Sequence, residues 1–174
     1  MKTHDRREET DRRPTLVGRL LLWLNLALAA VLGVFMLLDY RLAWGALVEE
    51  KRNSLQDEAK ILLPSVRRLR HEGTQTVQTY LDLTCGAMRD ATSPGHHIAA
   101  LLGDAVLQAH AHGRASPEML AAMEQAASTD RGTAPLGDDT IVVGSARAGD
   151  TVVYVSEYMS NMRRLLRRAM ARRL

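Results

Sequence analysis

An uninterrupted apolar run near the start of the chain constrains everything that can be built around it. Residues 20–38 (LLLWLNLALAAVLGVFMLL) form a run of 19 residues without a charge, and Asn25 is its one strongly polar side chain. A helix of this length spans about 28 Å, close to the thickness of the hydrocarbon core of a bilayer. The sequence therefore predicts a transmembrane helix over residues 16–39, preceded by a polar stub over residues 1–15.

A cleaved signal peptide is the alternative interpretation of this run. The apolar core of a signal peptide is shorter, about 7–15 residues, and it ends at a small-residue cleavage site. No such site follows the run here, where the nearest small residues surround Trp44. We therefore expect a retained anchor in the inner membrane. Six basic residues precede it and three lie in the 20 residues after it, which predicts a cytoplasmic N-terminus and an extracytoplasmic main domain.

The basic charge of the chain lies at its two ends. Residues 1–19 carry six basic and four acidic groups, residues 40–160 carry eleven basic and fifteen acidic groups, and residues 161–174 carry six arginines. The body of the chain is therefore acidic, which argues against a nucleic-acid partner, because a domain that binds nucleic acid needs a basic face. Cys85 is the only cysteine, so no intrachain disulfide can form, and we interpret it as a small buried residue.

After the anchor, apolar residues recur at the spacing of one helix face. Val48, Leu55, Leu62 and Leu69 are each seven residues apart, which predicts a helical stalk over residues 40–72. This seam would face either a second copy of the chain, in a homodimer, or the chain's own domain. We assign the charged residues between the seam positions to a solvated surface: Glu49, Glu50, Lys51, Arg52, Asp57, Glu58, Lys60, Arg67 and Arg68.

The fold class that we expect for residues 73–157 is α+β. Gly103-Asp104 and Gly149-Asp150 each separate two apolar or β-branched runs, which is the pattern of two β-hairpins. We therefore predict a small antiparallel sheet of four strands with helices packed on one face.

Three helices accompany this sheet in our prediction. The first is an amphipathic helix over about residues 76–90. The second begins after Ser116, which fits an N-cap and precedes a proline, and a polar loop then leads to the second hairpin. The third is a basic amphipathic helix that begins near Ser156 and fills residues 158–174.

The histidines are the best local indication of a binding site. If Gly103 and Asp104 form the turn, Leu102 pairs with Ala105 and His97 lies across from His110. His112 would share their face, and three imidazoles so placed predict a Zn²⁺ or Ni²⁺ site or a proton sensor. The alternative is a solvated sheet face rich in histidine. An unknown small ligand, ion or proton would bind between the sheet and residues 117–136, and our candidate ligand-binding residues are His97, His110 and Arg114.

The arginine-rich end, RRLLRRAMARRL, has three interpretations. It would bind anionic lipid as an interfacial helix, bind nucleic acid, or lead into a second membrane span. Nucleic acid is disfavoured, because the predicted topology places this segment outside the cell and it lacks aromatic side chains for stacking. We expect the third, with an exit helix that returns to the membrane.

No sequence motif of an enzyme or a cofactor site occurs in the chain. A P-loop, GxGxxG, GxSxG, HExxH and CxxC are all missing from the sequence. We therefore predict no catalytic residue and no cofactor for this chain.

Two segments carry a resemblance to a known family. SPGHHIAALLGDAVLQAHAHG and GDTVVYVSEYMSNMRRLLRRAMARRL resemble the hairpin, closing strand and exit helix of an extracytoplasmic PAS-like (Cache-type) sensor domain. With the cytoplasmic stub, membrane helix and stalk, residues 16–174 resemble the input region of a bacterial two-component sensor histidine kinase. The phospho-accepting histidine and the ATP-binding region of that family are not among these residues.

The resemblance implies a sensory input module that detects an extracytoplasmic stimulus and relays it across the membrane. It also implies a homodimer through the stalk, and a cognate response regulator only if a kinase core exists. Input domains of chemoreceptors and of cyclic-dinucleotide cyclases would look the same within these residues. A different class stays open as well, namely a complete single-pass envelope protein whose outer domain binds a protein partner or a metal without signalling.

Overall fold

The computed structural model describes residues 16–91, 96–110 and 113–160. The chain divides into two compact units, Met1–Leu42 and Ala43–Leu174. Three predicted features lie wholly or mainly outside the described residues: the polar stub over residues 1–15, His112, and residues 161–174 of the basic exit helix.

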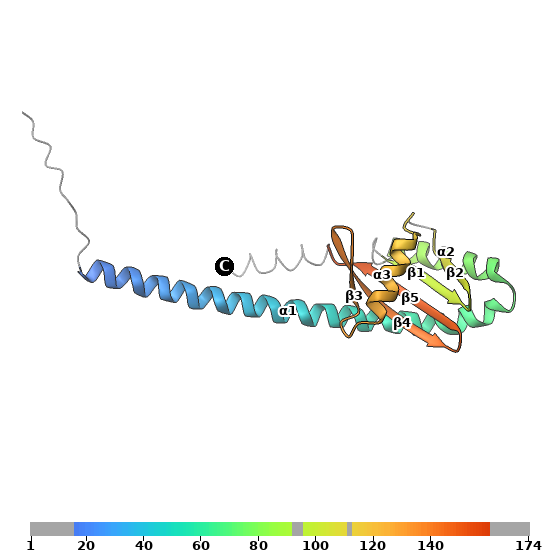
Figure 1. The fold of residues 1–174 in the computed structure, drawn as a ribbon, viewed down its shortest axis with the longest axis horizontal. Helices are drawn as coiled ribbons and strands as arrows, with labels where there is room; N and C mark the ends of the chain where they lie inside the picture. The colour runs from blue at the N-terminus through green and yellow to red at the C-terminus, as the bar shows by residue number, and fades with distance from the viewer. Residues whose placement is uncertain (1–15, 92–95, 111–112, 161–174) are drawn as a thin grey trace, which may run out of the picture. The chain divides into compact units, whose positions relative to one another are not determined.

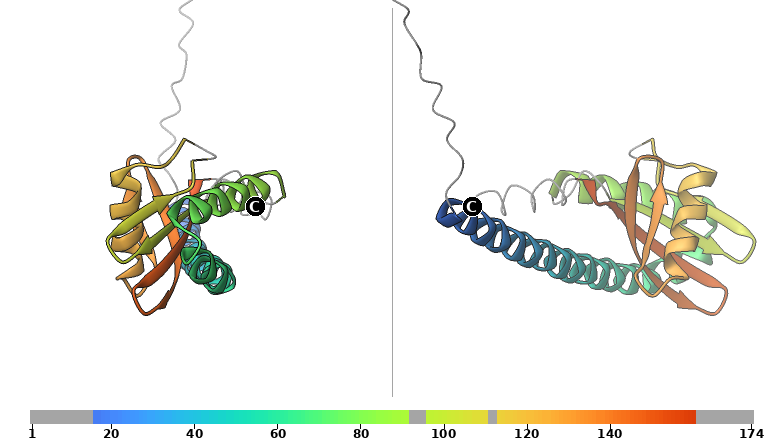
Figure 2. Two further views of the ribbon diagram at one scale, coloured as in Figure 1. Left: turned by 90° about the vertical axis from the view of Figure 1, so that its right-hand side faces the viewer. Right: turned by 60° about the vertical axis from the view of Figure 1, so that its left-hand side comes forward.

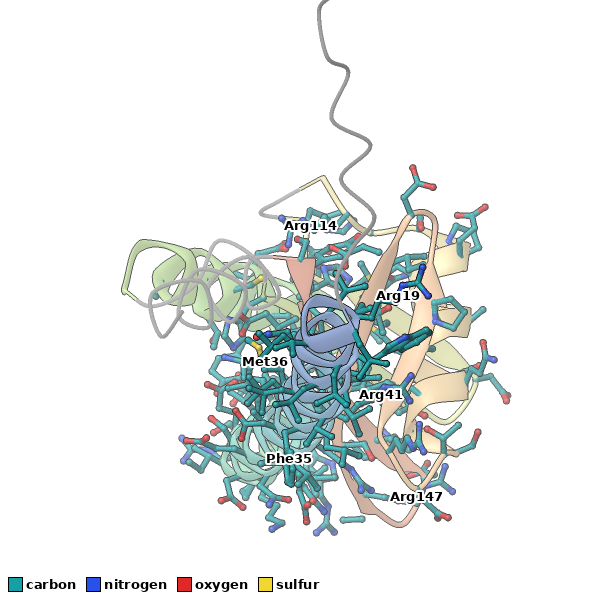
Figure 3. All side chains as sticks on the ribbon, turned by 90° about the vertical axis from the view of Figure 1, so that its left-hand side faces the viewer. Arg19, Phe35, Met36, Arg41, Arg114 and Arg147 are labelled. Carbon is teal, nitrogen blue, oxygen red and sulfur yellow. The ribbon has the colours of Figure 1, made fainter. Side chains whose placement is uncertain are left out.

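The first unit contains the beginning of helix α1 (Leu16–Arg70). Its apolar side chains are exposed throughout the predicted membrane segment, as at Phe35, which is 67% exposed (Figure 3). Among the described residues, α1 is the one helix long and apolar enough to cross a membrane, and a signal sequence would meet the same criterion. The Asn25 amide nitrogen donates to the Leu21 carbonyl oxygen at 2.8 Å.

The second unit is an α+β domain, as predicted, but its sheet has five strands instead of four (Figure 1). All neighbouring strands are antiparallel, and their order is β2-β1-β5-β4-β3. The strands are β1 (His97–Leu102), β2 (Ala105–Gln108), β3 (Thr133–Leu136), β4 (Asp139–Ala148) and β5 (Thr151–Tyr158). The first and last strands of the domain, β1 and β5, are therefore neighbours inside the sheet.

The additional strand is β3, in a segment that we predicted to be a polar loop. It is four residues long and includes Pro135, which is exposed. Strand β3 lies at the edge of the sheet and pairs with β4 alone, with Pro135 opposite Thr140. An edge position tolerates proline, because one side of the strand needs no ladder hydrogen bonds.

Both predicted hairpin turns are confirmed. Leu102 pairs with Ala105, and Ala148 pairs with Thr151. The glycines between them, Gly103 and Gly149, both have a φ of 63°, a left-handed conformation that glycine adopts without steric cost.

Helices cover both faces of the sheet, whereas we predicted them on one. Helices α1 and α2 (Thr74–Ala91) lie on one face and α3 (Pro117–Ala127) lies on the other (Figure 2). Two hydrophobic cores result, one on each face. The run from Thr151 to Glu157 in β5 is buried at every position, which is typical of a strand that is covered on both sides.

The seam of the stalk faces the chain's own domain. Leu55, Ala59, Leu62 and Val66 are buried in the first core with residues of β1, β4 and β5. This observation decides between the two alternatives that the sequence left open for the seam. Helix α1 continues through Pro64, which lies on its exposed side.

The last strand extends further than predicted. Ser156 and Glu157 belong to β5, where Ser156 pairs with His97 on one side and with Val143 on the other. The predicted helix start near Ser156 is therefore wrong, because backbone pairing on both sides holds this segment extended. Met159 follows the strand and is fully buried in the first core.

Candidate functional site

Four ionisable side chains meet where helix α1 lies against the sheet. Lys51 and Glu58 come from α1, His96 directly precedes β1, and Glu157 lies near the end of β5. We name this group the α1 charge cluster. Lys51 and Glu58 are seven residues apart, so both lie on the side of the helix that carries the buried Leu55.

The sheet residues of the cluster point to the α1 face because strand side chains alternate. Val153 and Val155 are buried in the core beneath α1, and Glu157 follows them on the same face. In the same way, Ile98 is buried beneath α1, and His96 precedes it by two residues.

The contacts of the cluster join the helix to two strands. The Lys51 ammonium forms an ion pair with Oε2 of Glu157. The His96 ring lies between two carboxylates, with Nε2 3.2 Å from Oε2 of Glu58 and Nδ1 3.5 Å from Oε2 of Glu157. The His96 side chain is only 3% exposed, so this ring exchanges its water contacts for the two carboxylates.

Helix α2 closes the cluster from another direction. The Cys85 thiol lies 3.7 Å from the His96 carbonyl oxygen and is fully buried. The prediction that Cys85 is a small buried residue is confirmed.

Three further contacts fix α1 to the sheet domain. The Arg70 guanidinium binds the Asp150 carboxylate through two hydrogen bonds, of 2.5 and 2.7 Å, at the β4–β5 turn. These bonds lower the pKa of Asp150 and raise the pKa of Arg70. The Arg52 guanidinium donates to the Asp130 carbonyl oxygen. Gly144 of β4 lies directly against the α1 backbone.

The cluster can bind and release a proton. A neutral imidazole donates one hydrogen bond, whereas the protonated ring donates two, and here both ring nitrogens face carboxylate oxygens. In the described part of the chain, no group of three or more His, Cys, Asp or Glu side chains is arranged to hold a metal ion.

The residues predicted from the histidine pattern lie in other surroundings. His97 is fully buried, and its Nε2 lies 3.2 Å from Oε1 of Gln108, whose amide nitrogen donates to the Ser116 carbonyl oxygen. His97 is therefore on the α3 side of the sheet. That side holds a second core, so it is not the solvated histidine-rich face that we considered.

His110 lies beyond the end of β2 and contacts helix α2. Its Nδ1 is 2.9 Å from the Gln78 amide nitrogen, and its backbone N–H donates to Asp82 at 2.5 Å. Burial raises the pKa of Asp82, but the hydrogen bonds from His110 and Gln78 lower it by more, so the pKa is below its usual value. His97 and His110 thus contact different partners, and the metal site that also needs His112 stays a prediction.

The third candidate ligand-binding residue, Arg114, lies before α3 (Figure 3). Its guanidinium carbon lies 4.9 Å from the centre of the Tyr158 ring, a cation–π contact with the end of β5. Side chains of α3 and β3, including Met119, Met123 and Ala134, pack on the sheet where we predicted the ligand.

Sequence reasoning missed the α1 charge cluster, although two signals for it were present. We assigned Lys51 and Glu58 to a solvated surface, but both are partly buried, at 22% and 29% side-chain exposure. Counting back two residues from the core residue Ile98 leads to His96, and counting forward two from Val155 leads to Glu157. The alternation of the two strands therefore pointed to the same helix.

Comparison of the chain with protein-family models, with curated proteins and with solved structures finds no significant match.

Proposed function

We propose that this chain is the membrane-anchored sensory input module of a two-component signal-transduction histidine kinase, which detects an extracytoplasmic stimulus and relays it across the membrane. The observation that carries the proposal is the continuity of α1. One helix, Leu16–Arg70, contains the apolar segment and also forms one wall of the core of the sheet domain. Any change in how the sheet packs on α1 is therefore applied to the membrane helix itself.

The contacts between α1 and the sheet suit such a relay. Leu55 and Leu62 are an apolar seam that permits small shifts, while ionic contacts at Lys51 and Arg70 hold one particular position. Packed interfaces of this kind switch between discrete arrangements and do not deform continuously. A stimulus that favours one arrangement over the other shifts the populations by the difference in its affinity for the two.

The topology of the domain also supports the proposal. A five-stranded antiparallel sheet in the order β2-β1-β5-β4-β3, with its N-terminal helix on one face, resembles the arrangement of PAS-like sensor domains. Fold alone does not define function, so the argument depends on the helix that links this sheet to the apolar segment.

The partners that we propose are the lipid bilayer and a second copy of the chain. Because Leu55 and Leu62 are occupied by the chain's own sheet, a homodimer would use another face of α1 or α2. The apolar residues exposed there include Ile61 and Leu83, at 74% and 70% exposure.

A chimaeric receptor tests the proposal. Residues 1–174 would be joined to the second membrane span and kinase core of a characterised sensor kinase, and kinase output would be read from a reporter gene. Leu62→Ala removes a buried contact of α1, and the matched control Ile61→Ala changes a 74% exposed neighbour. We expect Leu62→Ala to change the output at least threefold in either direction and Ile61→Ala to leave it unchanged, at equal receptor levels in the membrane.

Output that is the same in the parent chimaera and in both variants would overturn the proposal and favour an envelope protein that binds a partner without signalling. The orientation needs its own test. In a Cys85→Ala background, Asp57→Cys on the exposed side of α1 should react with a membrane-impermeant maleimide in intact spheroplasts. Protection until lysis would contradict an extracytoplasmic domain.

A further inference from the structure

We infer that His96 is a proton-binding site that controls how tightly α1 is held on the sheet, so that the stimulus is extracytoplasmic acidity. The signalling part of this inference rests on the proposed function. The proton site itself is a property of the domain and is testable without any output.

The placement of the ring carries the inference. Its two nitrogens face carboxylates from two different elements, Glu58 of α1 at 3.2 Å and Glu157 of β5 at 3.5 Å. The neutral ring has one N–H, so its other nitrogen would direct a lone pair at a carboxylate oxygen. The protonated ring donates to both. The arrangement with α1 on the sheet therefore fits the protonated form.

The burial of the site increases the effect of this proton. His96 is 3% exposed at its side chain, and Glu157 is 10% exposed. Interactions between charges are stronger where water is excluded, and breaking a buried pair leaves a charge without compensation. Losing the proton therefore removes two ionic contacts between α1 and the sheet together.

The described groups around the ring come from three elements. Helix α1 supplies Glu58 and the Lys51 ammonium that also holds Glu157, strand β5 supplies Glu157, and helix α2 supplies the Cys85 thiol near the His96 carbonyl. The neighbouring His97 points to the opposite face, where it contacts Gln108. The ring is the group among these whose usual titration range, about pH 5–8, matches a moderate acid signal.

The direction of the effect follows from which state holds the proton. If the packed arrangement binds a proton that the separated helix and sheet release, packing is favoured as the pH falls and weakened as it rises through the histidine range. Below about pH 4.5 the carboxylates themselves become protonated, and the advantage is lost again. The contact is therefore tightest in mild acid.

The test uses the full chain in detergent micelles. Trp23→Phe leaves Trp44, which packs against the core beneath α1, as the one tryptophan. Its fluorescence reports urea unfolding between pH 5.5 and 8.5, with EDTA present throughout. The variants are His96→Gln and Glu58→Gln, and the matched controls are His71→Gln and Glu50→Gln, which change exposed residues at the end of α1 and on its surface.

We expect the ratio of folded to unfolded chain to fall as the pH rises, by up to about tenfold per pH unit, the limit for one linked proton. His96→Gln should abolish this dependence, Glu58→Gln should reduce it at least twofold, and both controls should retain it. An unchanged dependence in His96→Gln would overturn the inference. If that variant does not fold, NMR titration of the His96 ring decides, because a ring that stays neutral from pH 5.5 upward would overturn it too.

The chimaeric receptor separates this inference from the proposed function. Loss of pH-dependent output in His96→Gln, with the parent chimaera responding to external pH, supports both. A pH-dependent fold combined with output that ignores external pH leaves the proton site in place and overturns the claim that acidity is the stimulus. Output that ignores pH but responds to Leu62→Ala retains the relay and rejects acidity alone.

Discussion

Gly144 of strand β4 lies directly against the backbone of Gln56 in helix α1, so that a Cβ atom on Gly144 would overlap the main chain of the helix. The lack of a side chain at this position sets how closely α1 approaches the sheet. The buried Leu55 precedes Gln56, and the contact therefore lies at the centre of the seam.

Gly144→Ala should destabilise the domain by about 1–3 kcal/mol or more, because the obstructing atoms are backbone and cannot move aside like a flexible side chain. The free energy of unfolding from urea titration measures this. Gly45→Ala is the matched control, since a Cβ there meets no atom within 4 Å. It should stabilise the helix by about 0.5–1 kcal/mol. Equal stability of Gly144→Ala and the parent chain would contradict the close approach.

The ion pair of Arg70 and Asp150 should make stability depend on acid pH. Hydrogen bonds from Arg70 lower the pKa of Asp150 in the folded chain. A carboxylate whose pKa is lowered by folding contributes stability above its unfolded pKa, about 3.9. This contribution is lost as the pH falls through the lower, folded value.

Asp150→Asn should therefore be less stable than the parent chain at pH 7, and the difference should disappear toward pH 2.5. Asp104→Asn, in the equivalent turn of the β1–β2 hairpin, is the control and should match the parent at both pH values. A difference between Asp150→Asn and the parent that stays constant with pH would assign the effect to the turn and not to the ion pair.

Ser116 should stabilise the start of α3. Its hydroxyl accepts a hydrogen bond from the Met119 backbone N–H at 3.1 Å. Ser116→Ala should cost about 1 kcal/mol, as expected for loss of an N-cap. The measurement is thermal unfolding by circular dichroism, with the exposed Ser128→Ala at the other end of α3 as a control that stays within about 0.5 kcal/mol. A cost as small as that of the control would contradict the capping role.

The parts of the fold that the sequence predicted are those with local signals. Gly103-Asp104 and Gly149-Asp150 specify tight turns by their own conformation, and Ser116 specifies a helix start. Strand β3 lacks such a signal, because its extended form depends on pairing with β4, which is distant information for a segment that contains Pro135.

The candidate site was missed for a related reason. The spacing of Met159 and Met162 suggested a helix from Ser156, and this removed Glu157 from the strand that points it at α1. Of the two adjacent histidines, His97 drew attention through its distance from the turn. Only the packing of α1 on the sheet shows that His96 faces the helix.

The central claim is that α1 must move against the sheet to carry a signal, and a reversible cross-link tests it most directly. In a Cys85→Ala background of the chimaeric receptor, Arg70→Cys and Asp150→Cys would replace the side chains that join α1 to the β4–β5 turn. A short bis-methanethiosulfonate would bridge the two positions, and reductant would release it. Arg70→Cys alone, treated identically, is the control.

The measurement is kinase output at one fixed pH before cross-linking, after it, and after reduction. We predict that cross-linking shifts output at least threefold and that reductant restores it, with no change in the single-cysteine control. Output that stays the same in the cross-linked and reduced receptor would contradict the claim that movement of α1 on the sheet carries the signal.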